Sequence, residues 1–338
     1  MKRAVIFGAH SAGLVDATEP RPRENWALVK VHVTPMCTEY KAYKAGRRVE
    51  FLGHEAVGEV VEVAQPGRVK AGDRVVVMPL YPCGKCEFCV AGEYIHCEHL
   101  IDYREYAGTD EGHTTYTQYL LKPDWLLPAI PDDVSYERAA LALCGLGPSF
   151  GALQSMGLSA YDTVLITGLG PVGLGGVINA RYRGARVIGV ESVAWRAERA
   201  LQMGAEVVLD PRDADILKKI QALTGGKGVD CALDCSGTVQ AERLCIDSAR
   251  RKGKVAFVGE CSDDLAIQVS PDMIRKGLTV IGSWHYNLND YPAVMQVIRK
   301  SPVIDLLVSH VMPMRNVQDA FELQMTGQCA KVLLKPWD

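Results

Sequence analysis

Residues 164–191 read VLITGLGPVGLGGVINARYRGARVIGVE, and this stretch decides how the second half of the chain folds. It opens with a short apolar run that suits a buried parallel strand. Glycines follow at Gly168, Gly170 and Gly173, and residues 172–182 then predict a helix. A second β-branched run completes the stretch. Strand, glycine turn, helix and strand in this order are typical of a dinucleotide-binding unit.

Each glycine of the turn has a physical role. The first permits a tight turn from strand to helix, the second lets the backbone approach a pyrophosphate, and the third lets helix and strand pack closely. Free N–H groups and the helix dipole favour an anion at the start of the helix. Because the chain has 32 glycines, a purely structural glycine turn is the alternative.

An acidic residue closes the same stretch. Glu191 lies 23 positions after Gly168, where a carboxylate can accept hydrogen bonds from an adenosine ribose. Its charge would repel a 2′-phosphate, so it favours NAD over NADP. The next cation that could neutralise a 2′-phosphate, Arg196, comes only five residues later. The residues expected to bind the cofactor are Gly168, Gly170, Pro171, Val172, Gly173, Glu191 and Arg196.

Length and composition narrow the class of protein. A chain of 338 residues suggests about two domains, and 48% hydrophobic with 23% charged residues is ordinary for a soluble globular protein. The net charge of −3 indicates no nucleic-acid or anionic-membrane partner. No apolar run approaches the roughly 20 residues needed to span a bilayer. Eleven cysteines without a signal segment favour metal binding and buried thiols in a reducing cytoplasm.

Four of these cysteines lie close together, with the spacing C-x2-C-x2-C-x7-C. They are Cys83, Cys86, Cys89 and Cys97. Four thiolates at this spacing can close a tetrahedral zinc site. Because the protein would fill every position on the metal, such a site is structural and not catalytic. An iron–sulfur cluster and four unrelated thiols are the alternatives.

The order of predicted elements divides the chain. Many short β-branched runs before residue 128 predict a domain of the β-barrel type. Alternating strands and helices after residue 191 predict βαβ units and a parallel sheet. The tail, with helices over 291–300 and 317–325 and a strand over 331–334, is assigned to the first domain. The expected domains are 1–148 with 288–338, and 149–287.

Together these motifs resemble the zinc-containing medium-chain dehydrogenase family, which includes alcohol, sorbitol and threonine dehydrogenases. The resemblance spans nearly the whole chain and includes Cys37, the triplet Gly53-His54-Glu55, the four-cysteine segment and the glycine turn. Residues 278–283 and 290–292 are similar to the polyol and threonine branch. The resemblance implies an α/β fold with a GroES-like catalytic domain of the β-barrel type and a Rossmann domain with a doubly wound parallel sheet.

The family also implies a second, catalytic zinc. Cys37 and His54 match its first two ligands, and Cys144-Gly145-Leu146 is similar to the pattern that supplies a third ligand in alcohol dehydrogenases. Two thiolates and one imidazole leave a fourth position for water or a substrate oxygen. A core histidine and buried thiols are the alternatives. Glu55 is expected beside the ligands, where it orients or transiently replaces one, with a solvated surface acid as the alternative.

One stretch departs from the family pattern. Relatives carry a small residue, then Ser or Thr, then Asp after the first zinc cysteine, whereas this chain reads Cys37-Thr38-Glu39-Tyr40. Glu39 therefore takes the place of the hydroxyl that passes on the substrate proton. A carboxylate in hydrogen-bond range can accept that proton. The hypothesis is that Glu39 contacts the substrate or the proton path; the alternative is that Thr38 or water relays the proton.

These residues predict an oxidoreductase. Zinc lowers the pKa of an alcohol hydroxyl and polarises a carbonyl, which suits hydride exchange with a nicotinamide. We expect two zincs per chain, NAD, and a secondary alcohol or ketone as the small-molecule substrate, in the class of polyols, sugars or amino-alcohols. The alternatives are a zinc-free or redox-neutral member of the fold, a general alcohol dehydrogenase or carbonyl reductase, and a nucleotide-binding protein without turnover. A cytoplasmic homodimer or homotetramer is expected.

Overall fold

The computed structural model describes residues 1–338, which form two compact units. Unit 1 consists of Met1–Leu143, Asn287–Arg299 and Val308–Asp338, and unit 2 of Cys144–Tyr286 and Lys300–Leu307. Residues 144–148 and 300–307, which the sequence places in the first domain, group with unit 2. The turn at Ile304–Leu307 does so because it packs against a helix of that unit.

Unit 2 is built on one parallel sheet with the strand order β12-β11-β10-β7-β8-β9. The chain starts at the centre with β7, moves outward to β9, and then crosses back to β10. Ligands bind at this reversal in doubly wound sheets, outside the carboxyl ends of the strands. The strands are β7 (Thr163–Thr167), β8 (Arg186–Val190), β9 (Val207–Leu209), β10 (Val229–Asp234), β11 (Ala249–Phe257) and β12 (Thr279–Gly282).

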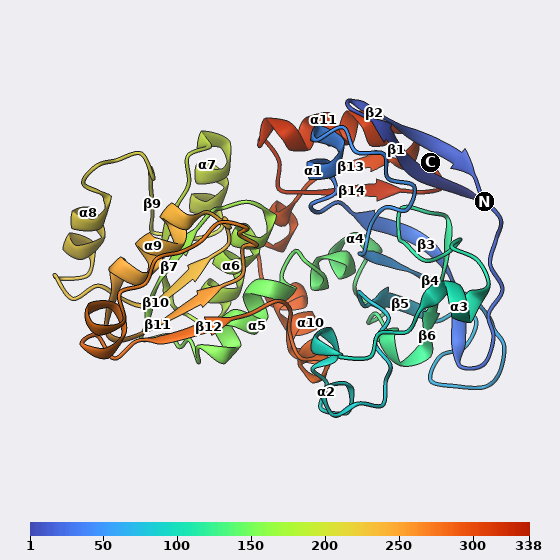
Figure 1. Ribbon diagram of the computed structural model, residues 1–338, viewed down its shortest axis with the longest axis horizontal. Coiled ribbons are helices and arrows are strands. Elements are labelled where there is room, and N and C mark those ends of the chain that lie inside the picture. Colours follow the sequence, from blue (N-terminus) through green and yellow to red (C-terminus); the bar gives the residue numbers. More distant parts are fainter. The chain divides into compact units, whose positions relative to one another are not determined.

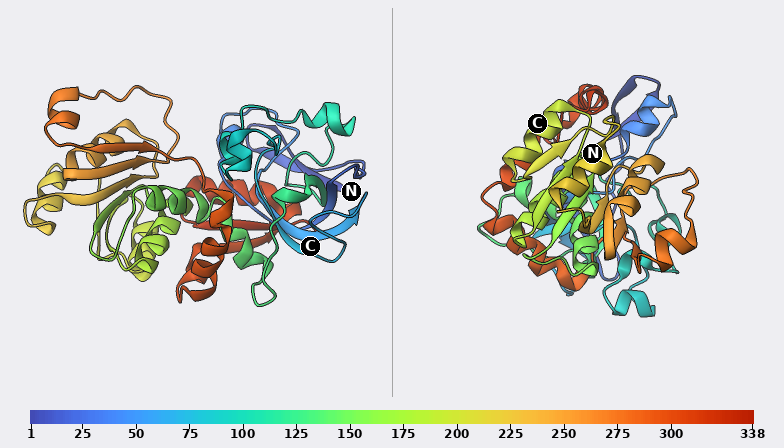
Figure 2. Two further views of the ribbon diagram at one scale, coloured as in Figure 1. Left: turned by 90° about the horizontal axis from the view of Figure 1, so that it is seen from below. Right: turned by 90° about the vertical axis from the view of Figure 1, so that its left-hand side faces the viewer.

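Helices cover this sheet, as Figures 1 and 2 show. Leu165, Ile188 and Ala232 on the central strands are completely buried, which explains why those strands read as continuous apolar runs. The helices are α5 (Gly147–Ser155), α6 (Pro171–Tyr182), α7 (Ala194–Gln202), α8 (Ile216–Leu223) and α9 (Val239–Ser248). The predicted fold class, a Rossmann unit and a β-rich unit in one chain, is confirmed.

Unit 1 contains a second sheet, with the order β13-β14-β3-β4-β5 and β6 paired to β3. Strand β14 pairs antiparallel with β3 through Leu334 opposite Thr34, so the late part of the chain completes a sheet that the early part begins. A hairpin of β1 and β2 lies beside it. The strands are β1 (Lys2–Gly8), β2 (Ser11–Asp16), β3 (Trp26–Pro35), β4 (Ala56–Val63), β5 (Arg74–Val77), β6 (Tyr119–Pro123), β13 (Val308–Pro313) and β14 (Lys331–Lys335).

The helices of unit 1 are mostly short. The sequence pattern predicts one helix over residues 135–143, but the structure has a single turn, α4, followed by a 3₁₀ turn at Ala140–Ala142. The unit has α1 (Tyr40–Lys44), α2 (Glu87–Val90), α3 (Tyr103–Ala107), α4 (Tyr136–Ala139), α10 (Tyr291–Lys300) and α11 (Val317–Thr326). None of the helices in either unit combines the length and apolar character needed to cross a membrane.

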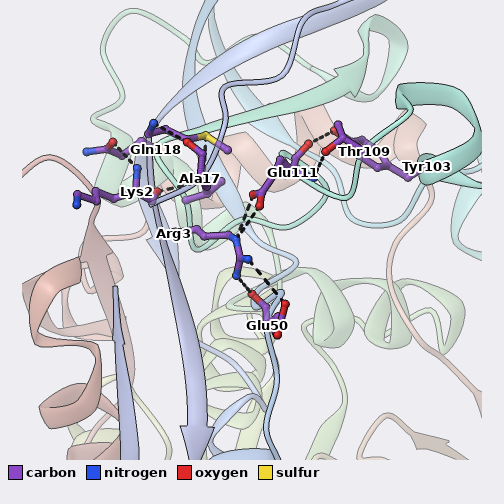
Figure 3. A network of polar contacts seen from close by, with 10 residues as sticks. Lys2, Arg3, Ala17, Glu50, Tyr103, Thr109, Glu111 and Gln118 are labelled. Atoms are coloured by element: carbon purple, nitrogen blue, oxygen red, sulfur yellow. Dashed lines mark hydrogen bonds and ion pairs between the residues drawn. The ribbon is translucent and has the colours of Figure 1, made fainter. Parts of the chain in front are cut away.

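A polar network around Arg3 holds two loops of unit 1 against β1 (Figure 3). The Arg3 Nε atom donates to both carboxylate oxygens of Glu111, at 3.2 and 3.1 Å, and its guanidinium also donates to the carbonyl of Glu50. The same guanidinium lies 4.5 Å from the ring centroid of Phe51. Arg3 therefore binds both loops. The loop with Glu50 continues into His54, and the loop with Glu111 continues into Tyr116.

Candidate active site and metal centres

The four cysteines of the C-x2-C-x2-C-x7-C segment come together around α2. Their sulfur atoms all lie within 4.8 Å of one another. Cys86 Sγ is 3.5 Å from Cys89 Sγ and 3.9 Å from Cys97 Sγ. Bonds of about 2.3 Å to a tetrahedral zinc would place sulfurs about 3.8 Å apart, so this set fits zinc.

Backbone N–H groups point at these sulfurs. The N–H of Cys83 donates to Cys97 Sγ at 3.3 Å, and the N–H of Cys86 donates to Cys83 Sγ at 3.4 Å. Burial raises the pKa of Cys83, but N–H donors from Lys85 and Cys86 outweigh it and lower this pKa to about 6. Cys83 thus favours the thiolate form that a metal requires, whereas burial and the neighbouring Cys86 raise the pKa of Cys89.

A second group combines different ligand types. Cys37, His54, Glu55 and Cys144 offer one ligand atom each, all within 4.8 Å of one another. Cys37 follows the end of β3, His54 and Glu55 precede β4, and Cys144 directly follows Leu143. Two thiolates, one imidazole and one carboxylate are a donor set that suits zinc. The structure brings all three expected ligands of the catalytic zinc together.

The glycine before His54 is required by its surroundings. Gly53 has φ +88°, and a Cβ there would lie 2.4 Å from Thr115 Oγ1 and 2.3 Å from the Tyr116 ring. A side chain would therefore clash and strain the backbone. Glycine lets the segment that carries His54 pack directly on the 115–116 loop.

Glu39 contacts two of the expected zinc ligands, His54 and Cys37. Its Oε1 lies 2.9 Å from His54 Nδ1, and its Oε2 accepts from the Cys37 N–H and the Tyr116 hydroxyl, each at 3.0 Å. Burial raises the pKa of Glu39, but the hydrogen bond and charge of His54 outweigh it and lower this pKa to about 2. Both oxygens of an ionised Glu39 thus contact protein groups, and its role toward the substrate or the proton path stays a prediction.

This contact also orients the imidazole. With Nδ1 engaged by Glu39, Nε2 is the nitrogen of His54 that would bind a metal. A carboxylate on the far nitrogen of a ligand histidine fixes the ring and raises its basicity. Tyr40, at the position of the usual Asp, begins α1. The carboxylate in contact with His54 thus belongs to Glu39, the residue before Tyr40.

Glu55 forms a buried ion pair that the sequence did not reveal. Lys331 Nζ on β14 lies 2.6 Å from Glu55 Oε1 and donates to the Met36 carbonyl at 2.9 Å. The lysine is 1% exposed and the glutamate fully buried. Burial raises the pKa of Glu55 to about 7 against the opposing effect of Lys331. Glu55 Oε1 is also 3.9 Å from His54 Nε2, so this carboxylate lies beside the ligand group.

Helix α11 supplies a further contact. Gln324 Nε2 donates to the carbonyl of Cys37 at 3.2 Å. Gln324 and Lys331 lie almost 300 positions after Cys37, and no spacing rule connects them. Only the β14–β3 register could have identified them, because pairing of Leu334 with Thr34 brings this region to Cys37.

The glycine turn of unit 2 has the geometry that a dinucleotide needs. Gly168 has φ +74°, and Gly170 directly precedes α6, which opens with Pro171 and Val172. A Cβ on Gly173 would lie 2.0 Å from the Gly168 carbonyl oxygen. Helix and turn therefore approach more closely than any side chain allows, and the first N–H groups of α6, which have no acceptor within the helix, can meet a phosphate.

Glu191 lies beside this turn. Its Oε2 accepts from the Leu169 N–H at 2.9 Å, and its Oε1 accepts from the N–H groups of Ser192 and Val193. The Arg196 Nη1 atom is 3.8 Å from the place of a Cβ on Gly170, and its buried Nε has no hydrogen-bond partner. An acid that can meet a ribose and a cation that can meet a phosphate thus flank the turn.

Comparison with known proteins covers both units. The family model described as "Alcohol dehydrogenase GroES-like domain" matches residues 23–132, and "Zinc-binding dehydrogenase" matches residues 171–300. The chain is 31% identical to D-arabitol-phosphate dehydrogenase from Enterococcus avium, over 97% of this chain and 95% of the relative. It is equally 31% identical to sorbitol dehydrogenase from Bacillus subtilis, over 99% and 97%.

The chain belongs to the zinc-containing medium-chain dehydrogenases. Among this family, L-threonine 3-dehydrogenase from Pyrococcus abyssi is 31% identical over 96% of this chain and 95% of the relative. The alcohol dehydrogenase TADH from Thermus sp. ATN1 superposes with a TM-score of 0.89 at 25% identity, covering 99% of both chains. This medium-chain dehydrogenase is thus a zinc-containing alcohol oxidoreductase that uses NAD, as predicted.

The four-cysteine site gives a first test. Cys86→Ser is expected to lose one zinc per chain and to lower the melting temperature, because a structural zinc contributes directly to folding. Zinc at Cys37 and His54 should be retained. Elemental analysis and thermal unfolding measure both effects. The matched control is Cys261→Ser, a thiol in neither metal group, which should change neither quantity. Unchanged zinc content and melting temperature in Cys86→Ser would rule out a metal role.

Glu39 gives a second test. Glu39→Gln keeps the size of the side chain but replaces an acceptor of the Cys37 N–H and Tyr116 hydroxyl with an amide. Loss of such a partner typically weakens metal affinity by about 10- to 100-fold. Zinc competition with a chromogenic chelator measures this affinity. Tyr116→Phe, which leaves Glu39 and His54 in contact, should have a smaller effect. Full zinc affinity combined with lost turnover would instead support a role of Glu39 at the substrate.

Proposed function

We propose that this dehydrogenase oxidises a secondary alcohol of the polyol, sugar or amino-alcohol class and reduces the corresponding ketone in reverse, with NAD as the hydride carrier. The observation that carries the proposal is the convergence of Cys37, His54 and Cys144, because three such ligands leave a fourth position for a substrate oxygen. The names of the relatives support the class, since arabitol phosphate, sorbitol and threonine all carry a secondary hydroxyl.

The residues around this group have separate roles in the proposal. Cys37, His54 and Cys144 hold zinc, which supplies a Lewis acid for an alcohol or carbonyl oxygen. Glu39 holds the imidazole of His54, and Lys331 holds Glu55 beside the ligands. The four cysteines from Cys83 to Cys97 hold a second zinc that only stabilises the fold, which gives two zincs per chain.

The cofactor site is proposed at the carboxyl end of β7. Backbone N–H groups at the start of α6 meet the pyrophosphate of NAD, and Arg196 adds a positive charge next to Gly170. Glu191 accepts hydrogen bonds from the adenosine ribose and disfavours a 2′-phosphate. Pro171 and Val172 form the first turn of the helix, where a missing proline N–H costs nothing.

Two measurements, the zinc content per chain and the turnover of alcohols with NAD, separate three alternatives. A zinc-free or redox-neutral relative would hold at most one zinc, and a nucleotide-binding protein would bind NADH without turnover. A general alcohol dehydrogenase or carbonyl reductase would turn over simple alcohols as well as polyols. The intact set of Cys37, His54 and Cys144 favours the zinc-dependent oxidoreductase over the first two.

We also propose that the protein is a cytoplasmic homodimer or homotetramer. Strand β12 is the edge of its sheet and pairs only with β11, and Thr279 and Gly282 on it are exposed. Ile274, which precedes this strand, is 70% exposed. An unpaired edge with apolar neighbours suits pairing with a second copy. Light scattering should therefore give a multiple of 36.9 kDa, and a monomer mass at assay concentration would contradict the proposal.

Cofactor choice and substrate class are tested together. Polyols, sugars, amino-alcohols and simple alcohols are assayed for NADH and NADPH formation. The wild type should prefer NAD, and Glu191→Ala should reduce that preference by about tenfold, because roughly 1.4 kcal/mol of repulsion and ribose contact is lost. Asp210→Ala, an exposed acid further along the chain, is the control. A wild type that favours NADP would refute the role of Glu191, and turnover of simple alcohols alone would refute the substrate class.

A further inference from the structure

Helix α6 packs directly on the segment that contains Cys144. A Cβ on Gly175 would lie 1.9 Å from the Gly145 carbonyl oxygen and 3.4 Å from the Leu146 Cα atom. Only a glycine lets the helix come so close to these two residues. The peptide that follows Cys144 is therefore in van der Waals contact with the backbone of α6.

Asn179, one helical turn after Gly175, holds the same segment through hydrogen bonds. Its Nδ2 donates to the Leu146 carbonyl and to Ser149 Oγ, each at 3.0 Å. Ser149 Oγ donates to the same Leu146 carbonyl at 3.0 Å, and the Phe150 N–H does so at 2.8 Å. Three donors thus converge on one carbonyl oxygen, which fixes the backbone two residues after Cys144.

Apart from these hydrogen bonds, asparagine at position 179 is unfavourable for stability. Asn179 is fully buried, and its Oδ1 has no hydrogen-bond partner. Leaving a buried acceptor unpaired costs free energy, and asparagine is a poorer helix former than leucine. A leucine would fill similar space without either cost. What Asn179 alone supplies is the Nδ2 donor to Leu146 and Ser149.

We propose that Gly175 and Asn179 are positioning residues for Cys144, acting through the backbone of Gly145 and Leu146. The inference rests on the proposed role of Cys144 as a ligand of the catalytic zinc. Helix α6 then has two tasks. Its N-terminal end forms part of the dinucleotide turn, and its side face positions the Cys144 thiolate, the proposed third zinc ligand. The two tasks lie on different parts of α6, so they can be separated by mutation.

The test is Asn179→Leu in the full-length protein. Zinc that remains during dialysis against EDTA is measured over time, and NADH affinity is measured by fluorescence titration. We expect one of two zincs to leave at least tenfold faster than in the wild type, while the Kd for NADH stays within twofold. A helix that merely lost stability would weaken NADH binding as well, so the split between the two readouts identifies positioning.

The matched control removes a comparable hydrogen bond from the other end of α5. Lys254 Nζ donates to the carbonyl of Met156, the last capping residue of that helix, at 2.6 Å. Lys254→Met should keep both zincs. Gly175→Ala, which adds one methyl group to the contact with Gly145, should reproduce the loss of one zinc if Asn179→Leu proves difficult to fold.

The outcomes separate this inference from the proposed function. Normal zinc retention in both Asn179→Leu and Gly175→Ala would overturn the positioning role, as would equal zinc loss in Lys254→Met. Cys144→Ser provides the reference. If it loses one zinc while the two α6 variants keep both, only the positioning role fails. If it keeps two zincs, Cys144 is not a ligand and the proposed third ligand fails with it.

Discussion

The arrangement of Cys37 and His54 depends on a buried charge pair, Lys331 with Glu55, whose nearest atoms are 2.6 Å apart. Two charges taken out of water stabilise a protein only when both are paired and hydrogen-bonded, and removal of either partner typically costs about 3–5 kcal/mol. Lys331 also binds the Met36 carbonyl, and Glu55 directly follows His54. The pair thus fixes the distance between the two segments that present Cys37 and His54.

Local patterns made much of this structure predictable. The glycine turn and the four-cysteine segment each lie within fewer than 30 consecutive residues, so the spacing alone defines the geometry. Alternating strands and helices predicted the parallel sheet of unit 2, and all six of its strands pair in parallel. Boundaries were less certain. The sequence pattern predicts a strand over residues 254–258, but β11 begins at Ala249, because the charged residues at its beginning hide the apolar pattern.

Contacts between distant segments were not predictable in the same way. The role of Glu39 was open because sequence gives a residue's place in a motif but not the direction of its side chain. The structure turns both carboxylate oxygens toward His54, Cys37 and Tyr116. No sequence motif identifies Lys331, Gln324 or Asn179 as a functional residue. Their roles follow from strand register and helix packing, which depend on the whole fold.

Unit 1 is built from separate early and late segments of the chain, and this has a consequence for biosynthesis. The four-cysteine segment occupies 15 contiguous residues and can close around a metal as soon as it leaves the ribosome. The centre at Cys37 requires β14, whose Lys331 is 295 positions away from Met36. All of residues 144–286 are synthesised in the interval, and domains generally fold as units in order of synthesis. With the metal sites assigned as proposed, the nascent chain acquires its two metals at different times, and until β14 is made Cys37 lacks the neighbouring contacts of Lys331 with the Met36 carbonyl and of Gln324 with its own carbonyl.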